Sequence, residues 1–596
     1  MRKSSCSCEE QSVERRPLIK HPFADRASIR GLLLAGVAAM VLAACGGEKP
    51  PESEEEAGPF IALNTETEAS RFLAQAGMGA SDAGIREVQG ADYTGWLDQQ
   101  FAMTPRNSHQ AYIDAVIASG QNPNQSHVMH TFWKQVATAP DQLRQKVAFA
   151  LSQIFVISQR DSTVGGYERG VASYLDMLGR EAFGNYRSLL EVVTRHPMMG
   201  LYLSHLRNQK ASGNRVPDQN YAREVMQLMS IGLYELNPDG TLVMANGAPV
   251  ETYGNEDIVG LSHVFTGFSW AGPDKQNGRF YGSSSNPPPD PNRDVLPMQG
   301  YPQFHSTEEK RFLGTIIASQ GTPDPDSSLR TALDAIFNHP NVGPFIGRQL
   351  IQRMVTSNPS PGYVARVAQA FNSGSYSRGN WRTGNGQRGD MRATIAAVLL
   401  DAEARDTGKM AEPGFGKVRE PVLRLAAWMR AFDAASASRN YLLGNTDSDS
   451  GSLGQSPMRS PSVFNFYRPG YVPPNTAIAA ANLVAPEFQI IHETSVVGYS
   501  NFMRNVVRYG VGSNSPRDIQ PDYTKELALA EDPDALVDRL DMLLTYGTMS
   551  TATRNLIRDA VESISINPMN PSSGRNNRVY VATLFAISSP DFLVQK

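Results

Sequence analysis

An apolar run that ends in a cysteine decides how much of this chain can fold into a domain. The run covers residues 31–44, follows a basic segment that ends in Arg26 and Arg30, and precedes Cys45 with Leu-Ala-Ala. This order is typical of a secretory signal, and the run is too short to span a bilayer as a helix. We therefore predict a signal peptide over 1–44, with Cys45 as the lipidated first residue of a bacterial envelope lipoprotein. The alternative is an ordinary signal peptide with an incidental cysteine.

Two details of the leader bear on export and destination. Gly46 follows the cysteine where an inner-membrane retention signal has Asp, so we expect the outer membrane if the cell has one. Residues 15–20 read Arg-Arg-Pro-Leu-Ile-Lys and resemble a twin-arginine export signal. Three charged residues between that motif and the apolar run give it an unusual spacing. General secretion and twin-arginine export therefore both stay open.

Composition excludes several kinds of site and partner. Cys6 and Cys8 lie in the leader and Cys45 would carry the lipid, so the mature chain has no free thiol. Disulfides, thiolate metal sites and a cysteine nucleophile are thereby excluded from the folded part. The net charge is −4 and 19% of residues are charged. This balance provides no basic footprint for nucleic acid.

A tether precedes the folded domain. Residues 48–59 contain only Glu, Lys, Pro, Ser, Ala and Gly, which cannot build a core. We predict an extended tether over 45–63, because prolines and like charges keep such a segment open. The domain is expected over 64–596, which exceeds the usual size of one core. Two lobes, about 64–320 and 321–596, are therefore possible.

Apolar residues recur at helical spacing between long loops. Tyr93, Trp96, Leu97 and Phe101 are typical, with spacings of three and four. The clear strand signal is an Asn-Gly pair between two short runs, which predicts a β-hairpin at about 241–253. We predict a mainly α, multi-helix globular domain with one short hairpin and long Gly- and Pro-rich loops that could border a site. The long loops are 271–303, 373–390 and 445–461.

Several motifs are spread from about residue 67 to the C-terminus. In chain order they include Arg71-Phe72-Leu73, Asn220-Tyr221-Ala222-Arg223-Glu224, Phe265-Thr266-Gly267-Phe268, Phe337-Asn338-His339-Pro340, Lys417-Val418-Arg419-Glu420-Pro421 and Phe464-Asn465-Phe466-Tyr467-Arg468-Pro469. Together they resemble the large bacterial family called domain of unknown function 1800. The resemblance implies no established activity. Members are often encoded beside a secreted protein of another uncharacterised family, which implies a protein partner.

The chain departs from the family pattern at three histidines. Many members have Trp-His-Asn-His where this chain has Leu-Ser-Gln-Ile at 151–154, and Glu-Leu-His where it has Gln-Leu-Met at 227–229. Imidazole is the commonest neutral metal ligand, and neither Ile154 nor Met229 can replace it. We therefore expect no bound metal and no cofactor.

Two candidates for acid–base chemistry remain. Asn220, Arg223, Glu224 and Gln227 share one helix face. Glu224 could act as a general base if burial raised its pKa, or the face could be a structural ion-pair network. His305 ends a long loop and could transfer a proton near neutrality, or fix the loop through one hydrogen bond.

Other candidates lie in the later motifs. Phe464, Asn465 and Arg468 place an aromatic ring beside an amide and a guanidinium, a combination that suits carbohydrate rings. If buried, the same residues would lock two helices together. Glu420 opens a helix, where a carboxylate complements the helix dipole. The full set of binding or structural motif candidates is Asn220, Arg223, Lys310, Arg419, Glu420, Phe464, Asn465 and Arg468.

Two classes of function stay open. No phosphate-cradling loop, dinucleotide fingerprint, serine-hydrolase elbow or zinc-protease pair occurs in the sequence. One class is a non-catalytic envelope lipoprotein that binds or assembles an extracellular or envelope polymer, a polysaccharide for example, with a secreted partner. The other is a hydrolase-like enzyme acting on such a polymer, with Glu224 and His305 as its acid–base residues.

Overall fold

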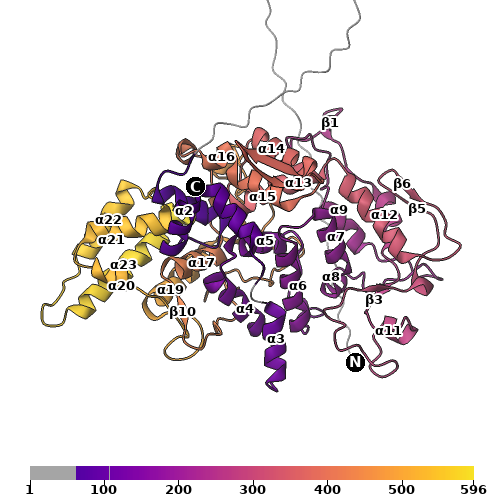
Figure 1. The fold of residues 1–596 in the computed structure, drawn as a ribbon, viewed down its shortest axis with the longest axis horizontal. Helices are drawn as coiled ribbons and strands as arrows, with labels where there is room; N and C mark the ends of the chain where they lie inside the picture. The colour runs from indigo at the N-terminus through magenta and orange to yellow at the C-terminus, as the bar shows by residue number, and fades with distance from the viewer. Residues whose placement is uncertain (1–61, 106–107) are drawn as a thin grey trace, which may run out of the picture. The chain divides into compact units, whose positions relative to one another are not determined.

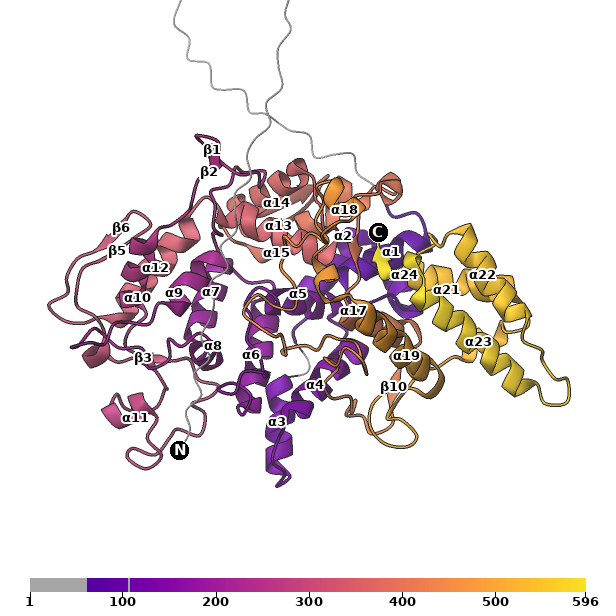
Figure 2. The ribbon, with the colours of Figure 1, turned by 180° about the vertical axis from the view of Figure 1, so that it is seen from behind.

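Helical periodicity is realised along most of the chain. The computed structural model describes residues 62–105 and 108–596, which contain 24 α-helices and six two-stranded antiparallel pairs (Figures 1 and 2). The predicted signal peptide, Cys45 and nearly all of the tether lie outside the described residues. The mainly α class is therefore confirmed.

The described residues contain eleven α-helices in the first half of the chain and thirteen in the second half. Those of the first half are α1 (Glu66–Ala76), α2 (Asp82–Ala102), α3 (His109–Ala118), α4 (Gln125–Thr138), α5 (Gln142–Ser152), α6 (Glu168–Glu181), α7 (Tyr186–Arg195), α8 (Pro197–Tyr202), α9 (Asn220–Gln227), α10 (Asn255–Val264) and α11 (Asn277–Tyr281). Those of the second half are α12 (Pro325–Asn338), α13 (Val342–Met354), α14 (Pro361–Ser373), α15 (Met391–Leu400), α16 (Ala402–Arg405), α17 (Pro421–Ala431), α18 (Ala477–Ala480), α19 (Glu493–Tyr509), α20 (Thr524–Ala528), α21 (Pro533–Leu540), α22 (Thr551–Glu562), α23 (Pro571–Ser588) and α24 (Pro590–Leu593).

Local sequence sets many helix ends. Thr65 caps α1, and Glu68 completes a capping box by accepting a hydrogen bond from the Thr65 backbone N–H. α14 begins at Pro361, which needs no backbone N–H there, and ends at Gly374 with a φ of 65°. α17 likewise begins at Pro421, directly after the Arg-Glu pair of the family motif. These ends fix which residues reach the interior.

The predicted hairpin is confirmed over its central residues. β1 (Met244–Ala245) pairs with β2 (Ala248–Pro249), and Asn246 and Gly247 form the turn with φ values of 52° and 79°. The strands of the other pairs are also only two to four residues long, and their sequence signals are weaker. They are β3 (Phe268–Ser269) with β4 (Gln299–Gly300), β5 (Lys310–Phe312) with β6 (Thr315–Ile317), β7 (Ser375–Arg378) with β8 (Trp381–Gly384), β9 (Lys417–Val418) with β12 (Val594–Gln595), and β10 (Ala435–Ser436) with β11 (Ile519–Gln520).

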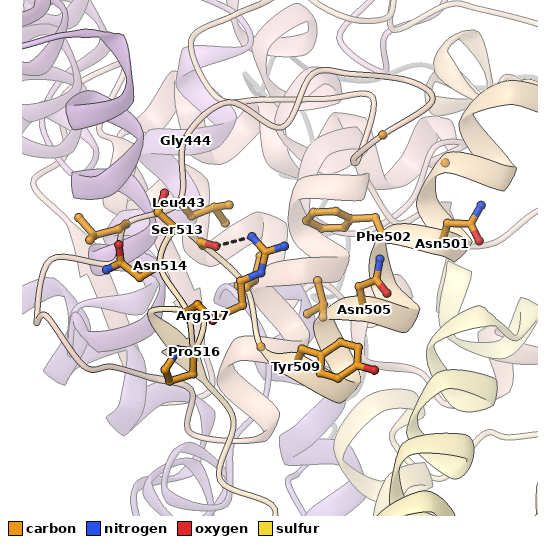
Figure 3. Close-up of a pocket in the computed structure, with 18 of the residues that line it drawn as sticks. Leu443, Gly444, Asn501, Phe502, Asn505, Tyr509, Ser513, Asn514, Pro516 and Arg517 are labelled. Carbon is orange, nitrogen blue, oxygen red and sulfur yellow. Dashed lines mark hydrogen bonds between the residues drawn. The ribbon is translucent and has the colours of Figure 1, made fainter.

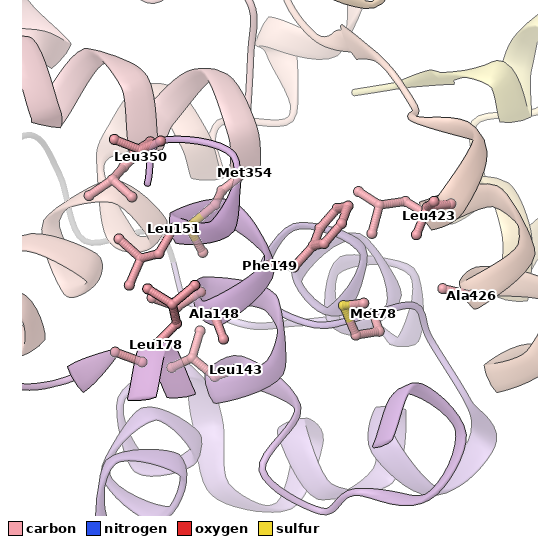
Figure 4. Close-up of a cluster of buried hydrophobic side chains, with 14 of the residues drawn as sticks. Met78, Leu143, Ala148, Phe149, Leu151, Leu178, Leu350, Met354, Leu423 and Ala426 are labelled. Atoms are coloured by element: carbon pink, nitrogen blue, oxygen red, sulfur yellow. The ribbon is translucent and has the colours of Figure 1, made fainter. Parts of the chain in front are cut away.

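The core joins helices from both halves of the chain. α5 packs against α1, α2, α4, α6 and α13. Figure 4 shows Leu143 and Leu151 of α5 near Leu350 and Met354 of α13, with Leu423 of α17 in the same cluster. The described residues form one compact unit, and the division into two lobes near residue 320 stays a prediction.

The helices of the structure lie within residues 62–105 and 108–596. None of the helices described there combines the length and the apolar character needed to cross a bilayer.

Candidate functional site

A cleft of about 480 Å³ opens where four segments of the chain meet. We call it the arginine cleft. Its walls come from the end of α5, the end of α9, one face of α13 and the aromatic motif near residue 465. The lining residues that matter below are Gln153, Ile154, Gln227, Leu228, Phe345, Arg348, Gln349, Gln352, Arg353, Phe464, Tyr467 and Arg468.

Helix α13 supplies most of the polar groups of the cleft. Phe345, Arg348, Gln349, Gln352 and Arg353 recur at helical spacing and therefore share one face. The helix begins after Asn341, which is fully buried. The Asn341 side-chain amide donates to the backbone oxygens of Ile231 and Tyr234, each at 2.8 Å. These bonds hold the start of α13 against the segment that follows α9.

Two buried donors in the cleft lack an acceptor. The guanidinium of Arg353 is only 6% exposed and donates to the backbone oxygens of Gln349 and Gln153 at 3.1 and 3.2 Å. Its Nε has no hydrogen-bond partner, and neither has Nε2 of Gln349, a residue that is 7% exposed. An unsatisfied buried donor costs about 1–3 kcal/mol. Such donors are expected where a ligand or water supplies the acceptor.

The aromatic motif forms a wall that is mainly aromatic, whereas the wall formed by α13 is mainly polar. Phe464 is half-buried and lines the cleft, with the guanidinium of the exposed Arg468 lying 4.5 Å from the centre of its ring. Tyr467 is buried, and its hydroxyl lies 3.5 Å from the side-chain oxygen of Gln153. Asn465 is buried with a φ of 64° and does not line the cleft. The predicted trio is therefore divided between the cleft and the interior.

A buried ionic network adjoins the cleft, in which both carboxylate oxygens of Glu420 have partners whereas Oε2 of Glu487 has none. The buried Glu420 carboxylate accepts hydrogen bonds from Gln153 at 2.6 Å and Gln455 at 2.8 Å, and lies 3.5 Å from the Lys417 ammonium. Burial acts to raise the pKa of Glu420, but the Lys417 ammonium and the hydrogen bond from the Gln455 amide oppose it, and the pKa lies below its usual value. Lys417 also pairs with the buried Glu487 at 3.2 Å.

Arg419, the neighbour of Glu420, serves packing. It is buried, with its guanidinium 4.2 Å from the centre of the Phe592 ring. Its backbone N–H donates to the backbone oxygen of Leu593 at 2.8 Å, which ties β9 to the last strand. Arg419 is not among the residues that line the arginine cleft.

The predicted polar face of α9 divides among three environments. Asn220 and Arg223 are exposed, Glu224 is 7% exposed, and Gln227 lines the cleft. Burial raises the pKa of Glu224 and Arg223 opposes that rise, while the Oε2 atom of the carboxylate has no hydrogen-bond partner. Gln227 accepts a hydrogen bond from the Tyr253 hydroxyl at 3.3 Å. Glu224 thus lies one helical turn from the cleft.

His305 and Lys310 form a separate buried cluster. His305 is 0% exposed, with one ring nitrogen 2.8 Å from the backbone oxygen of Thr266 and the other 3.0 Å from the Ser328 hydroxyl. Burial lowers the pKa of His305 to about 4 and that of Lys310 to about 8. Neither residue lines the arginine cleft. Of the two interpretations of His305, this environment favours the one in which it fixes the loop.

A second hollow was not anticipated from the sequence. The asparagine groove, of about 890 Å³, runs along one face of α19, where Asn501, Asn505 and Tyr509 recur every four residues (Figure 3). Across from them lies the exposed Arg517, which donates to the backbone oxygen of Gly512 at 2.8 Å. No buried unsatisfied donor has been found among the described residues of this groove.

Comparison with known proteins identifies the family. The model of a family described as a protein of unknown function (DUF1800) matches residues 71–594. The chain belongs to the DUF1800 family. No curated protein and no solved structure gives a significant match. In this DUF1800 member the segments that end α5 and α9 meet, because Gln153 and Ile154 line the same cleft as Gln227 and Leu228.

Within residues 62–105 and 108–596, no three His, Cys, Asp or Glu side chains are grouped so that they could hold an ion. The absence of a bound metal stays a prediction, which elemental analysis of the purified protein would test.

Proposed function

We propose that this DUF1800 member is an envelope lipoprotein that binds a segment of an extracellular or envelope polymer in the arginine cleft, and that it acts with a secreted partner. One observation carries the proposal. Apolar and aromatic side chains stand beside unpaired donors, and the described residues of the lining include no Asp, Glu or His. Acid–base catalysis most often uses such a group within reach of the substrate, whereas binding does not need one.

The chemistry of the lining suits a sugar polymer. Pockets that bind organic ligands are mostly apolar, with a few placed polar groups, and this cleft has that composition. Phe464 and Phe345 offer ring faces for the apolar side of a sugar. Nε2 of Gln349 offers a donor for its hydroxyl groups, whereas Nε2 of Gln352 already donates to the backbone oxygens of Ser357 and Pro469.

Removal of one ring tests the binding site. Full-length protein in detergent is passed over immobilised envelope polysaccharide, with Phe464→Ala compared with Tyr509→Ala, which deletes an exposed ring of the asparagine groove. We expect Phe464→Ala to lower the affinity about tenfold, since an aromatic contact and its buried area are lost. The Tyr509 variant should bind as the wild type does. Equal retention of all three proteins would contradict binding in the cleft.

Envelope anchoring has its own test, at a residue outside the described part of the chain. Cys45→Ser should abolish labelling of the protein by a lipid precursor, because no thiol remains to accept the lipid. The domain should still fold, since the lipid and the core are separate. Unchanged labelling of the variant would rule out the lipoprotein assignment.

One observation supports the alternative function, a hydrolase-like enzyme. Glu224 has a raised pKa and an unpartnered carboxylate oxygen, one turn from a cleft residue. A general base has these properties. If the wild type releases reducing ends from the bound polymer and Glu224→Gln does not while still binding it, the protein is an enzyme. If the wild type releases none, this alternative is dropped.

A further inference from the structure

We infer that the arginine cleft selects an acidic polysaccharide, in which a sugar ring packs against the aromatic wall and its oxyanion lies among Arg348, Arg353 and Arg468. The inference rests on the proposed function and names the class of polymer. The shared chemistry is a carboxylate or sulfate group carried by a sugar.

The charge of the lining is of one sign. Its three ionic side chains are Arg348, Arg353 and Arg468, and the described lining residues include no carboxylate. Arg348 and Arg468 are exposed at the rim, and no carboxylate of the described residues forms an ion pair with either. Other arginines of this fold have a carboxylate partner, for example Arg187 with Glu191 at 2.9 Å and Arg195 with Asp326 at 2.7 Å. Three unpaired guanidinium groups around one hollow attract an anion.

The deepest part of the cleft supplies donors for that anion. Nε of Arg353 and Nε2 of Gln349 are buried, belong to neighbouring turns of α13 and lack acceptors. An oxyanion accepts several hydrogen bonds at once, and a guanidinium offers a planar fork that matches it. A neutral hydroxyl group would satisfy the donors but would leave the charge uncompensated.

The protein's own carboxylates do not fill this role. Glu420 and Glu487 are the buried carboxylates that act on Arg353, but both are paired with Lys417, at 3.5 and 3.2 Å. The interior around them holds more positive than negative groups. Its buried cations include Lys417, Arg353, Arg419 and Arg424, and its buried carboxylates are Glu420 and Glu487. A ligand anion would offset this surplus.

The aromatic wall explains why the anion should be part of a sugar. Phe464 and Phe345 line the same hollow as the arginines, and Arg468 already lies over the Phe464 ring. A bare inorganic anion would leave these apolar surfaces in water. A sugar acid covers the rings with its apolar face and presents its charged group to the guanidinium groups.

Matched probes test the charge directly. Titration calorimetry on the full-length protein in detergent compares a galacturonate hexamer with its methyl ester, which has the same backbone and no charge. We expect the acid to bind at least about tenfold more tightly, since hydrogen bonds to charged groups are the stronger ones. Added salt should weaken the binding of the acid and leave the binding of the ester unchanged. A sulfated hexamer that binds in place of the galacturonate also supports the inference and identifies sulfate as the group.

Two exposed rim arginines allow a test that does not risk the fold. Arg348→Gln and Arg468→Gln should each weaken the acid about tenfold and leave the ester unchanged. Arg517→Gln is the matched control, because Arg517 is an exposed arginine of the asparagine groove. Equal affinity for acid and ester overturns the inference but leaves polymer binding in place. No binding of either acidic probe also overturns it, and the polysaccharide retention assay then decides separately on the proposed function.

Discussion

Glu420 and Glu224 are both buried glutamates, yet the protein treats them in opposite ways. Glu420 accepts hydrogen bonds from two amides at Oε2 and has a lysine beside Oε1, and its pKa lies below the usual value. Glu224 has only the exposed Arg223 as a charged neighbour, one carboxylate oxygen without a partner, and a raised pKa. Burial therefore does not by itself distinguish structure from function. The two glutamates differ instead in the number of hydrogen-bond donors that the fold provides to each carboxylate.

The same contrast occurs between two glutamines of the cleft. Gln153 donates to Glu420 and its side-chain oxygen faces the Tyr467 hydroxyl, so its amide is engaged at both ends. Gln349 is equally buried, but its Nε2 has no partner. Saturated groups hold the segments together, and we propose that the unsaturated donors of this cleft are left for a ligand.

Lowering the pH should produce the largest change in stability, because it protonates histidines that the fold keeps neutral. Burial lowers the pKa of His196 to about 3 and of His205 and His305 to about 4. The unfolded chain takes up protons first as the pH falls below about 6.5, so stability is complete above that pH and is lost down to about pH 4. Each group contributes about 3 kcal/mol to the loss.

Urea unfolding at steps from pH 7 to pH 4 measures this loss. The midpoint should fall steeply across that window, and His492→Gln, at an exposed position, should leave the slope unchanged. A midpoint that stays flat to pH 4.5 would show that the three imidazoles are not held neutral.

Removal of the saturated carboxylate should give the next largest effect. Glu420→Gln takes away the charge that Gln153, Gln455 and Lys417 surround, and we expect a loss of about 3–5 kcal/mol in the free energy of unfolding. Glu487→Gln should cost less, because burial already raises the pKa of Glu487 toward its neutral form. Chemical denaturation at pH 7 compares the two variants. Equal losses would mean that the two carboxylates share the role that we assign to Glu420.

The unsaturated carboxylate should give the smallest change in stability. Its folded pKa lies above the unfolded value, so the ionised form of Glu224 becomes a cost as the pH rises through that interval. Glu224→Gln should therefore unfold within about 1 kcal/mol of the wild type at acidic pH and be at least as stable at pH 8. Thermal melts at both pH values measure this. A loss of several kcal/mol at pH 8 would place Glu224 in an ion-pair network instead.

Much of the fold follows from local sequence signals. Helical spacing, proline at first positions and the Asn246-Gly247 turn are local, and the structure confirms the class and the hairpin. Strands as short as β9 and β12 are not readable in this way, because they pair across about 180 residues of chain and depend on packing.

The site was only partly predictable. Phe464 and Arg468 were candidates because they belong to an aromatic motif in the sequence, and both line the cleft. Gln349 and Arg353 were missed, although polar residues recur at helical spacing with Arg348 and Gln352 on α13, which is a usable signal. His305 shows the converse, since a sequence reveals a titratable ring but not that both of its nitrogens are occupied.

A matched pair of substitutions tests the central claim most directly. Gln153→Leu and Gln349→Leu change the same residue type at two buried positions of one cleft. We expect Gln153→Leu to lose about 3 kcal/mol of stability, because it removes a donor from the buried Glu420 carboxylate. Gln349→Leu should unfold within about 1 kcal/mol of the wild type, or be more stable, and bind the galacturonate hexamer about tenfold more weakly. A Gln349 variant that is as unstable as the Gln153 variant, with its binding intact, would contradict the assignment of unsaturated groups to the ligand.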